Sequence, residues 1–105
     1  MLVKINFSGY PQGMTTEAEI ESYFVARVKS VGGTAYKFRS MNHRGVSDRI
    51  ACMPSGEAWF VELKKPGGKL SPLQKLFADD MMALGQRYCC LWSKEDVDQW
   101  LLRFS

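Results

Sequence analysis

Hydrophobic residues recur at helical spacing in three stretches of this 105-residue chain. The first stripe consists of Ile20, Phe24, Val28 and Val31. Residues three or four positions apart share one face of a helix, so the stripe predicts an amphipathic helix. Thr16 and Glu19 have the spacing of a capping box, and Gly32 follows the last hydrophobic residue. We therefore expect a helix from Glu17 to Val31.

The same kind of pattern predicts two further helices. Their stripes consist of Leu73, Leu76, Phe77, Met81 and Leu84, and of Val97, Trp100, Leu101 and Phe104. Ser71 and Pro72 supply an N-cap and a first helical residue for the earlier of the two, which should end at Gly85. Ser93 and Asp96 are spaced to cap the later one.

Four short stretches have the composition of strands, at residues 34–39, 48–53, 58–65 and 87–92. Residues 40–47 are polar and should form a loop. Pro54 to Glu57 have turn chemistry, so the strands on either side should pair as an antiparallel hairpin. A strand, a helix and another strand in succession imply a parallel crossover. The predicted order α-β-β-β-α-β-α describes an α/β fold with a central mixed sheet flanked by helices.

Composition predicts one globular domain over residues 1–105. The chain is 46% hydrophobic and 24% charged, and no apolar run approaches the roughly 20 residues that span a bilayer. Residues 1–13 lack the basic and apolar segments of a signal peptide. The three cysteines, Cys52, Cys89 and Cys90, have neither disulfide-framework nor zinc-site spacing. We expect a soluble cytoplasmic protein with reduced cysteines and no membrane contact.

The strand predicted over residues 58–65 carries an acid and a lysine on one face. Side chains alternate along a strand, so Glu62 and Lys64 point to the same side as Phe60. The hairpin should bring Asp48 close to this pair. Charges on an apolar strand are costly without partners, and two acids with a lysine are what a metal-assisted phosphodiesterase needs. A solvent-facing stripe on an edge strand is the plain alternative.

The oxygen atoms of this cluster suit magnesium, which prefers oxygen ligands and retains several waters. We expect the carboxylates of Asp48 and Glu62 and the backbone carbonyl of Leu63 to bind Mg²⁺. Lys64 would orient the attacking water or stabilise the negative charge of the transition state.

The first predicted helix offers a further acid. Glu21 lies beside the apolar stripe and could contact a metal-bound water or support a second ion. Glu17 lies one turn earlier and competes for the same role. A glutamate on an amphipathic helix is more often a solvated charge. The position of Glu21 relative to the apolar stripe is what favours it for this role.

Three blocks of the sequence follow the pattern of one nuclease family. The blocks are Gly45 to Ile50, Phe60 to Lys64 and Gly68 to Gln74. They resemble the virus-type replication-repair nuclease family, VRR-NUC, of the restriction-endonuclease-like superfamily, over about residues 17–91. The resemblance implies that superfamily's fold and metal-dependent DNA cleavage. It implies an active site formed by Glu21, Asp48, Glu62 and Lys64, with Gln74 nearby on the second helix.

One position departs from the family pattern. Ser47 stands where the family usually carries proline before the first acid. Proline would only fix the backbone there, so serine should keep the metal site and change the stiffness of the loop. Gln74 has a plain alternative role as a polar residue in the first turn of a helix.

Basic residues bracket the acidic site in the sequence, which suits contacts to DNA phosphates. They are Arg39, His43, Arg44, Arg49, Lys65 and Lys69. Charged residues in loops are also the ordinary surface of a protein, and a net charge of +3 is too small to decide. The single histidine, His43, is expected at the DNA backbone rather than in catalysis.

The sequence therefore predicts a Mg²⁺- or Mn²⁺-dependent endodeoxyribonuclease acting on branched double-stranded DNA. Small standalone family members resemble Holliday-junction resolvases and act as homodimers, which implies the same here, in a bacterial or phage-infected cell. An exposed aromatic or methionine cluster could supply the dimer contact. The alternatives are a flap or nicking nuclease, and a catalytically silent nucleic-acid-binding module of the same fold.

Overall fold

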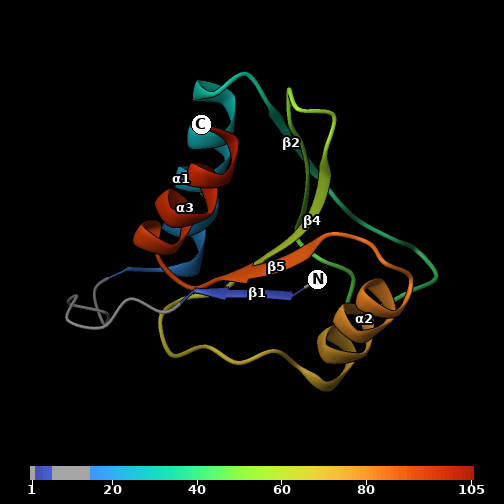
Figure 1. Cartoon of the computed structure of the whole chain (residues 1–105). Coiled ribbons are helices and arrows are strands. Elements are labelled where there is room, and N and C mark those ends of the chain that lie inside the picture. The colour runs from blue at the N-terminus through green and yellow to red at the C-terminus, as the bar shows by residue number, and fades with distance from the viewer. Residues whose placement is uncertain (1, 6–14) are drawn as a thin grey trace.

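The computed structural model describes residues 2–5 and 15–105 and contains a five-stranded sheet with three helices (Figure 1). The strands are β1 (Leu2–Ile5), β2 (Thr34–Lys37), β3 (Arg49–Cys52), β4 (Ala58–Leu63) and β5 (Tyr88–Leu91). The three α-helices are α1 (Glu17–Ser30), α2 (Pro72–Ala83) and α3 (Lys94–Leu101), and the short 3₁₀ helix η2 (Leu102–Phe104) follows α3. The strand order is β1-β5-β4-β3-β2, which confirms the α/β class with a mixed sheet flanked by helices.

The sheet has one strand more than the sequence predicted. Strand β1 pairs parallel with β5, from Leu2 opposite Tyr88 to Ile5 opposite Leu91. A four-residue edge strand gives almost no periodic signal, and its partner lies at the other end of the chain. The predicted order of the remaining elements, α-β-β-β-α-β-α, is confirmed.

The predicted hairpin is present between β3 and β4. The two strands pair antiparallel, with Arg49 opposite Val61 and Cys52 opposite Ala58. The turn between them is closed by a hydrogen bond from Met53 N to Glu57 O of 2.8 Å. Beyond the hairpin, α2 leads into β5, which pairs parallel with β4 as predicted for a crossover. Strand β4 thus lies at the centre of the sheet, with a neighbour on each side.

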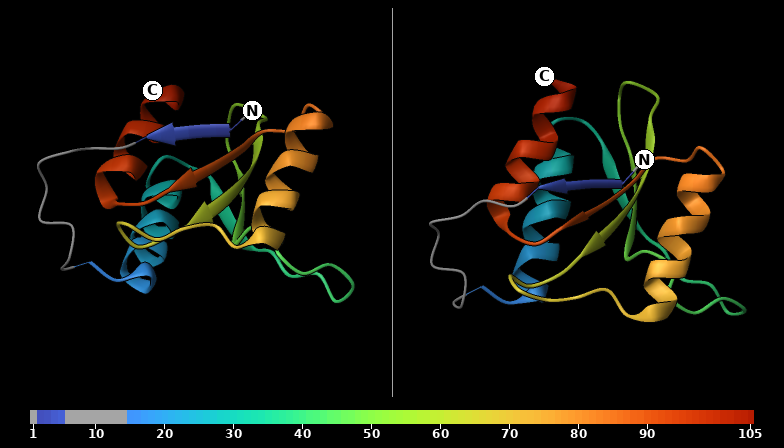
Figure 2. Two further views of the ribbon diagram at one scale, coloured as in Figure 1. Left: turned by 90° about the horizontal axis from the view of Figure 1, so that it is seen from below. Right: turned by 60° about the horizontal axis from the view of Figure 1, so that its bottom comes forward.

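Helices α1 and α3 cover one face of the sheet (Figure 2). The stripe of α1 is buried through Ile20, Phe24 and Val28, and α3 inserts Trp100 against Trp59 of β4 with ring centroids 5.7 Å apart. The helix caps predicted at the starts of α1, α2 and α3 are all present. Helix α1 ends at Ser30, one residue earlier than predicted. Val31 is its C-cap and is 41% exposed.

Helix α2 packs on the opposite face through an aromatic cluster. The rings are Phe38, Phe60, Phe77 and Tyr88, with neighbouring centroids 5.8–6.1 Å apart. The apolar stripe predicted for this helix is only half covered, since Ala78 is its one buried residue. Leu73, Leu76 and Leu84 are 45%, 58% and 67% exposed. Sequence periodicity predicts an apolar stripe on a helix, but it does not predict which parts of the protein cover that stripe.

The loop between β2 and β3 is held against the first turn of α2. Gly45 has φ +81°, and a Cβ built on it would lie 2.5 Å from the backbone of Leu73. Only glycine allows both this backbone conformation and this approach. Because Asp48 follows three residues later, the Gly45 contact fixes the start of β3 relative to α2.

We predict that Gly45→Ala destabilises the protein by about 2–4 kcal/mol, because it combines a left-handed backbone with a steric clash. Gly56→Ala is the matched control: its φ is +90°, but a Cβ there would meet nothing within 4 Å. Chemical denaturation of both variants separates the two effects. Equal losses of stability would show that close packing at residue 45 contributes nothing.

Candidate active site

Glu62 lies on the face of β4 that is turned toward α2. The predicted alternation is confirmed: Phe60 contacts Phe77 of α2, whereas Trp59 contacts Trp100 of α3. Glu62 points with Phe60 and is only 1% exposed. The structure therefore places a carboxyl group inside the protein, which is costly unless the group is neutralised or paired.

Asp48 is brought to Glu62 by the end of the hairpin. Its residue precedes β3, and its Oδ2 accepts a hydrogen bond of 2.9 Å from the backbone N–H of Leu63. The pairing of β3 with β4 ends at Arg49 opposite Val61. Beyond this pair, the Asp48 side chain supplies the acceptor for the backbone N–H of Leu63. As predicted, residues distant in sequence meet at the end of β3 and β4.

The environment of Glu62 favours its protonated form when no cation is present. Burial, followed by the negative charge of Asp48 and a hydrogen bond shared with it, raises the pKa of Glu62 to about 9. The positive charge of the Lys64 ammonium acts in the opposite direction and lowers this pKa. Two adjacent acids in an apolar setting therefore need a proton or a metal cation between them.

Gln74 connects this carboxyl group to the start of α2. Its Oε1 accepts a hydrogen bond of 2.8 Å from the backbone N–H of Ser71, and its Nε2 donates one of 3.2 Å to Glu62 Oε2. Ser71 Oγ in turn accepts from Gln74 N, which completes a capping box. The cap fixes which end of the Gln74 amide faces Glu62, so the predicted proximity of Gln74 has a structural cause.

The second oxygen of Glu62, Oε1, is buried and accepts no hydrogen bond from a donor group of the described residues. Across residues 2–5 and 15–105, no group of three or more His, Cys, Asp and Glu side chains could hold a metal ion. A cation that accepts two carboxylates, a backbone carbonyl and waters fits such a place, and Mg²⁺ has this preference. This oxygen beside Asp48 is therefore compatible with a magnesium or manganese ion.

Glu21 forms two ion pairs. Its Oε2 lies 2.9 Å from Arg49 Nε and 3.0 Å from Lys37 Nζ. Burial alone would raise the pKa of Glu21, but the hydrogen bonds and charges of Lys37 and Arg49 outweigh it and lower that pKa. Arg49 also donates to Ala35 O. Glu21 and Arg49 therefore form an ion pair that connects α1 to the neighbouring strands.

Glu17 is the other candidate acid of α1. Its negative charge contributes to the raised pKa of Glu62. Glu17 is the first residue of α1, so its position follows from where the helix begins. The choice between Glu17 and Glu21 could not be made from the stripe alone, because both residues lie on neighbouring turns of one helix edge.

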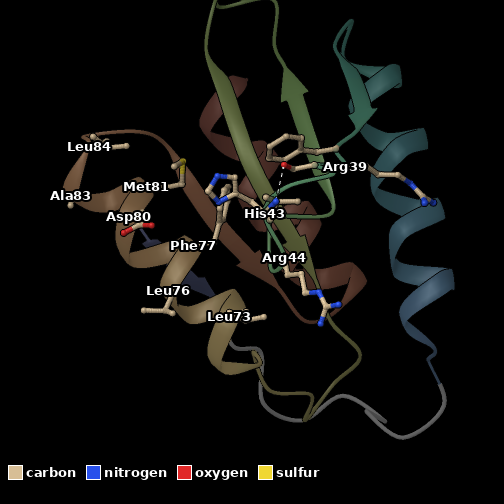
Figure 3. Close-up of a pocket in the computed structure, with 13 residues that line it drawn as sticks. Arg39, His43, Arg44, Leu73, Leu76, Phe77, Asp80, Met81, Ala83 and Leu84 are labelled. Atoms are coloured by element: carbon tan, nitrogen blue, oxygen red, sulfur yellow. Dashed lines mark hydrogen bonds between the residues drawn. The ribbon is translucent and has the colours of Figure 1, made fainter.

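The remaining basic residues of the predicted DNA surface are exposed on two loops. Arg39, His43 and Arg44 belong to the loop before β3, and Lys65 and Lys69 to the loop between β4 and α2. His43 points toward α2 across a groove, whereas the guanidinium of Arg39 points away from that helix (Figure 3). The two loops flank the Asp48 and Glu62 pair.

Two neighbours of the site were not foreseen. The indole Nε1 of Trp92 donates a 2.8 Å hydrogen bond to Gly68 O, which anchors the β4–α2 loop to the end of β5. Cys90 lies opposite Glu62 in the register of β4 and β5 and is fully buried. Nothing in the sequence spacing of Trp92 or Cys90 indicated a position beside the site.

The fold and the site together define a nuclease of the restriction-endonuclease-like class. No family model matches the chain. A protein of Acyrthosiphon pisum secondary endosymbiont phage 1, named "Putative nuclease p44", is 42% identical over 79 residues, which cover 75% of this chain and 85% of the phage protein. A solved "VRR_NUC domain" has a TM-score of 0.80 and 26% identity, covering 87% of this chain and 99% of that domain. The chain therefore belongs to the VRR-NUC family of nucleases.

No helix in residues 15–105 has the length and apolar character needed to cross a bilayer.

We predict that Glu62→Gln makes the metal-free protein more stable at high pH. Because the pKa of Glu62 is raised from 4.5 to about 9, the folded state binds a proton that the unfolded chain has released between these values. This contribution to stability is fully present below pH 4.5 and declines as the pH rises toward 9. Glutamine removes the decline, by an amount on the order of a few kcal/mol.

Thermal unfolding in EDTA from pH 5 to pH 9 measures the effect. The melting temperature of the variant should exceed that of the wild type by a margin that widens with pH. A constant difference across this range would contradict a buried acid with a raised pKa.

Proposed function

We propose that this nuclease is a Mg²⁺- or Mn²⁺-dependent endodeoxyribonuclease that hydrolyses phosphodiester bonds of branched double-stranded DNA as a homodimer. The observation that supports metal dependence most directly is the buried Oε1 of Glu62 beside Asp48, which accepts no hydrogen bond from a donor group of the described residues. A carboxyl group in this position is better satisfied by a divalent cation than by solvent, from which it is excluded.

The residues would divide the chemistry as follows. Asp48, Glu62 and the carbonyl of Leu63 would hold the ion, which when bound polarises the scissile phosphate and lowers the pKa of a water. Lys64, whose positive charge lowers the pKa of Glu62, would orient that water or stabilise developing negative charge. Gln74 would keep one oxygen of Glu62 occupied and leave the other for the ion.

For the acid of α1 we propose Glu17 in place of Glu21. The charge of Glu17 acts on Glu62, and the carboxylate of Glu21 is occupied by Arg49 and Lys37. Glu17 would contact a metal-bound water or support a second ion. For the same reason Arg49 is left out of the proposed DNA surface.

Exposed cations would bind the DNA backbone near the site. Lys65 and Lys69 lie on the loop that joins Glu62 to α2, and His43 and Arg39 lie on the loop that precedes Asp48. Side chains of this kind bind phosphates without reading sequence. They would place a duplex across the ends of β3 and β4.

The preference for branched DNA and the homodimer rest on the family and on size. A two-fold dimer presents two sites to the paired scissile phosphates of a four-way junction. A flap or nicking nuclease is the alternative with the same chemistry, and a silent DNA-binding module is the alternative without it. The phage origin of the relative supports action in the cytoplasm of a bacterial or phage-infected cell.

The test is cleavage of labelled four-way junctions, flaps, nicked duplexes and linear duplexes with Mg²⁺ or Mn²⁺. The wild type should cut the junction fastest. Glu62→Gln and Lys64→Ala should each slow cutting at least about 100-fold, because each removes a group that holds the ion or stabilises the transition state. DNA binding measured in EDTA should change little.

Glu17→Gln and Glu21→Gln form the matched pair of control variants. Only the first should slow metal-dependent cutting, while the second should alter stability alone, since it breaks the ion pairs with Arg49 and Lys37. Unchanged cutting by Glu62→Gln or Lys64→Ala would remove those residues from the mechanism. A wild type that binds junctions and cuts no substrate with either metal would favour the silent module.

A further inference from the structure

The outward face of α2 is apolar and uncovered. Leu73, Leu76 and Leu84 lie along it, and each is at least 45% exposed. The face borders a groove of about 710 Å³ between α2 and the loop before β3. Into this groove Phe77 and Met81 project from the helix, with His43 facing them from the loop (Figure 3). An apolar stripe of this kind next to a groove is typical of a protein interface.

The leucines point to a protein partner rather than to DNA. Nucleic-acid surfaces that accept bases use aromatic rings as stacking platforms. Here the exposed positions of the face are aliphatic, and the rings of Phe38 and Phe77 pack on each other with centroids 6.0 Å apart. The apolar part of this surface therefore suits side chains of another folded protein.

The same face carries two opposite charges that have no partner within the described residues. Asp80 is exposed on α2, and Arg44 is exposed on the adjacent loop. Neither takes part in an ion pair with another residue of 15–105. The carboxylate of Asp80 lies among exposed leucines and would be stabilised by a cation of the partner. The guanidinium of Arg44 would be stabilised by an anion of the partner.

The positions of the two charges suit a two-fold partner. Gly45 contacts the backbone of Leu73, so Arg44 lies at the N-terminal end of α2, whereas Asp80 lies about two turns farther along the helix. If two α2 helices pack antiparallel about an axis near Phe77, the level of Asp80 in one copy coincides with the level of Arg44 in the other. The surface is then complementary to itself.

We propose that a second copy of this chain docks on this face, with the leucines of the two α2 helices in contact and Asp80 of each copy paired with Arg44 of the other. This rests on the homodimer of the proposed function and gives it a surface. Gln74 lies on another face of the same helix and holds Glu62, so the interface fixes how far apart the two active sites lie. Arg44 is assigned to the partner and no longer to DNA.

Sedimentation velocity of the metal-free and DNA-free protein at micromolar concentration tests the pairing. The wild type should be a dimer. Asp80→Arg and Arg44→Asp should each weaken it at least about 10-fold, because each places two like-charge pairs across the interface. An equimolar mixture of the two variants should recover the dimer, since every contact is then between opposite charges. A mixture that stays monomeric would overturn the proposed register.

The apolar contact is tested by Leu76→Glu, with Leu102→Glu as the matched control. Leu76 and Leu102 are 58% and 62% exposed, but Leu102 lies on η2 and outside the proposed face. Only Leu76→Glu should yield a monomer with an unchanged melting temperature. A monomeric wild type, or a dimer that survives Leu76→Glu, would overturn the proposal. Neither outcome bears on metal-dependent cutting, which is measured separately.

Discussion

The buried carboxyl group of Glu62 is the interaction on which the site depends. It lies on the central strand of the sheet, is 1% exposed and has a second acid beside it, and one of its oxygens accepts no hydrogen bond from a donor in the part of the chain that the structure describes. A group in this position lowers the stability of the metal-free fold whenever it is ionised. The protein tolerates it because β4 is held on both sides by β3 and β5, and by an aromatic cluster on the same face. The strand pairing and the aromatic packing around β4 thus offset the cost of burying the Glu62 carboxyl group.

Three local devices deliver the partners of this carboxyl group. The hairpin places Asp48, whose side chain continues the strand ladder to Leu63. The capping box of α2 orients the amide of Gln74 toward one oxygen only. The negative charge of Glu17, at the start of α1, adds to the raised pKa of Glu62. Each device lies at the end of a helix or strand, where backbone groups lack partners and side chains complete the hydrogen bonding.

The sequence predicted the parts of this arrangement that depend on local periodicity. Alternation along β4 placed Glu62 and Lys64 on one face, and the turn at residues 54–57 predicted the hairpin that brings Asp48 to them. For the helix-one acid the sequence favoured Glu21 and left Glu17 as its competitor. The pairing of Glu21 with Lys37 and Arg49 depends on two strands that periodicity does not position. Strand β1 and the exposed face of α2 could not be predicted from periodicity either. Each depends on tertiary packing, β1 on its pairing with β5 and the face of α2 on the absence of a neighbour among the described residues.

The central claim, that a divalent cation replaces a proton at Glu62, is tested most directly by calorimetric titration of the wild type with Mn²⁺ at pH 7.5 in buffers of different ionisation enthalpy. Because the pKa of Glu62 is about 9 without the ion, binding should release about one proton per ion. Asp48→Asn and Glu62→Gln should each weaken binding, and the second should abolish the release. Binding without proton release, or tight binding that survives Glu62→Gln, would contradict the account.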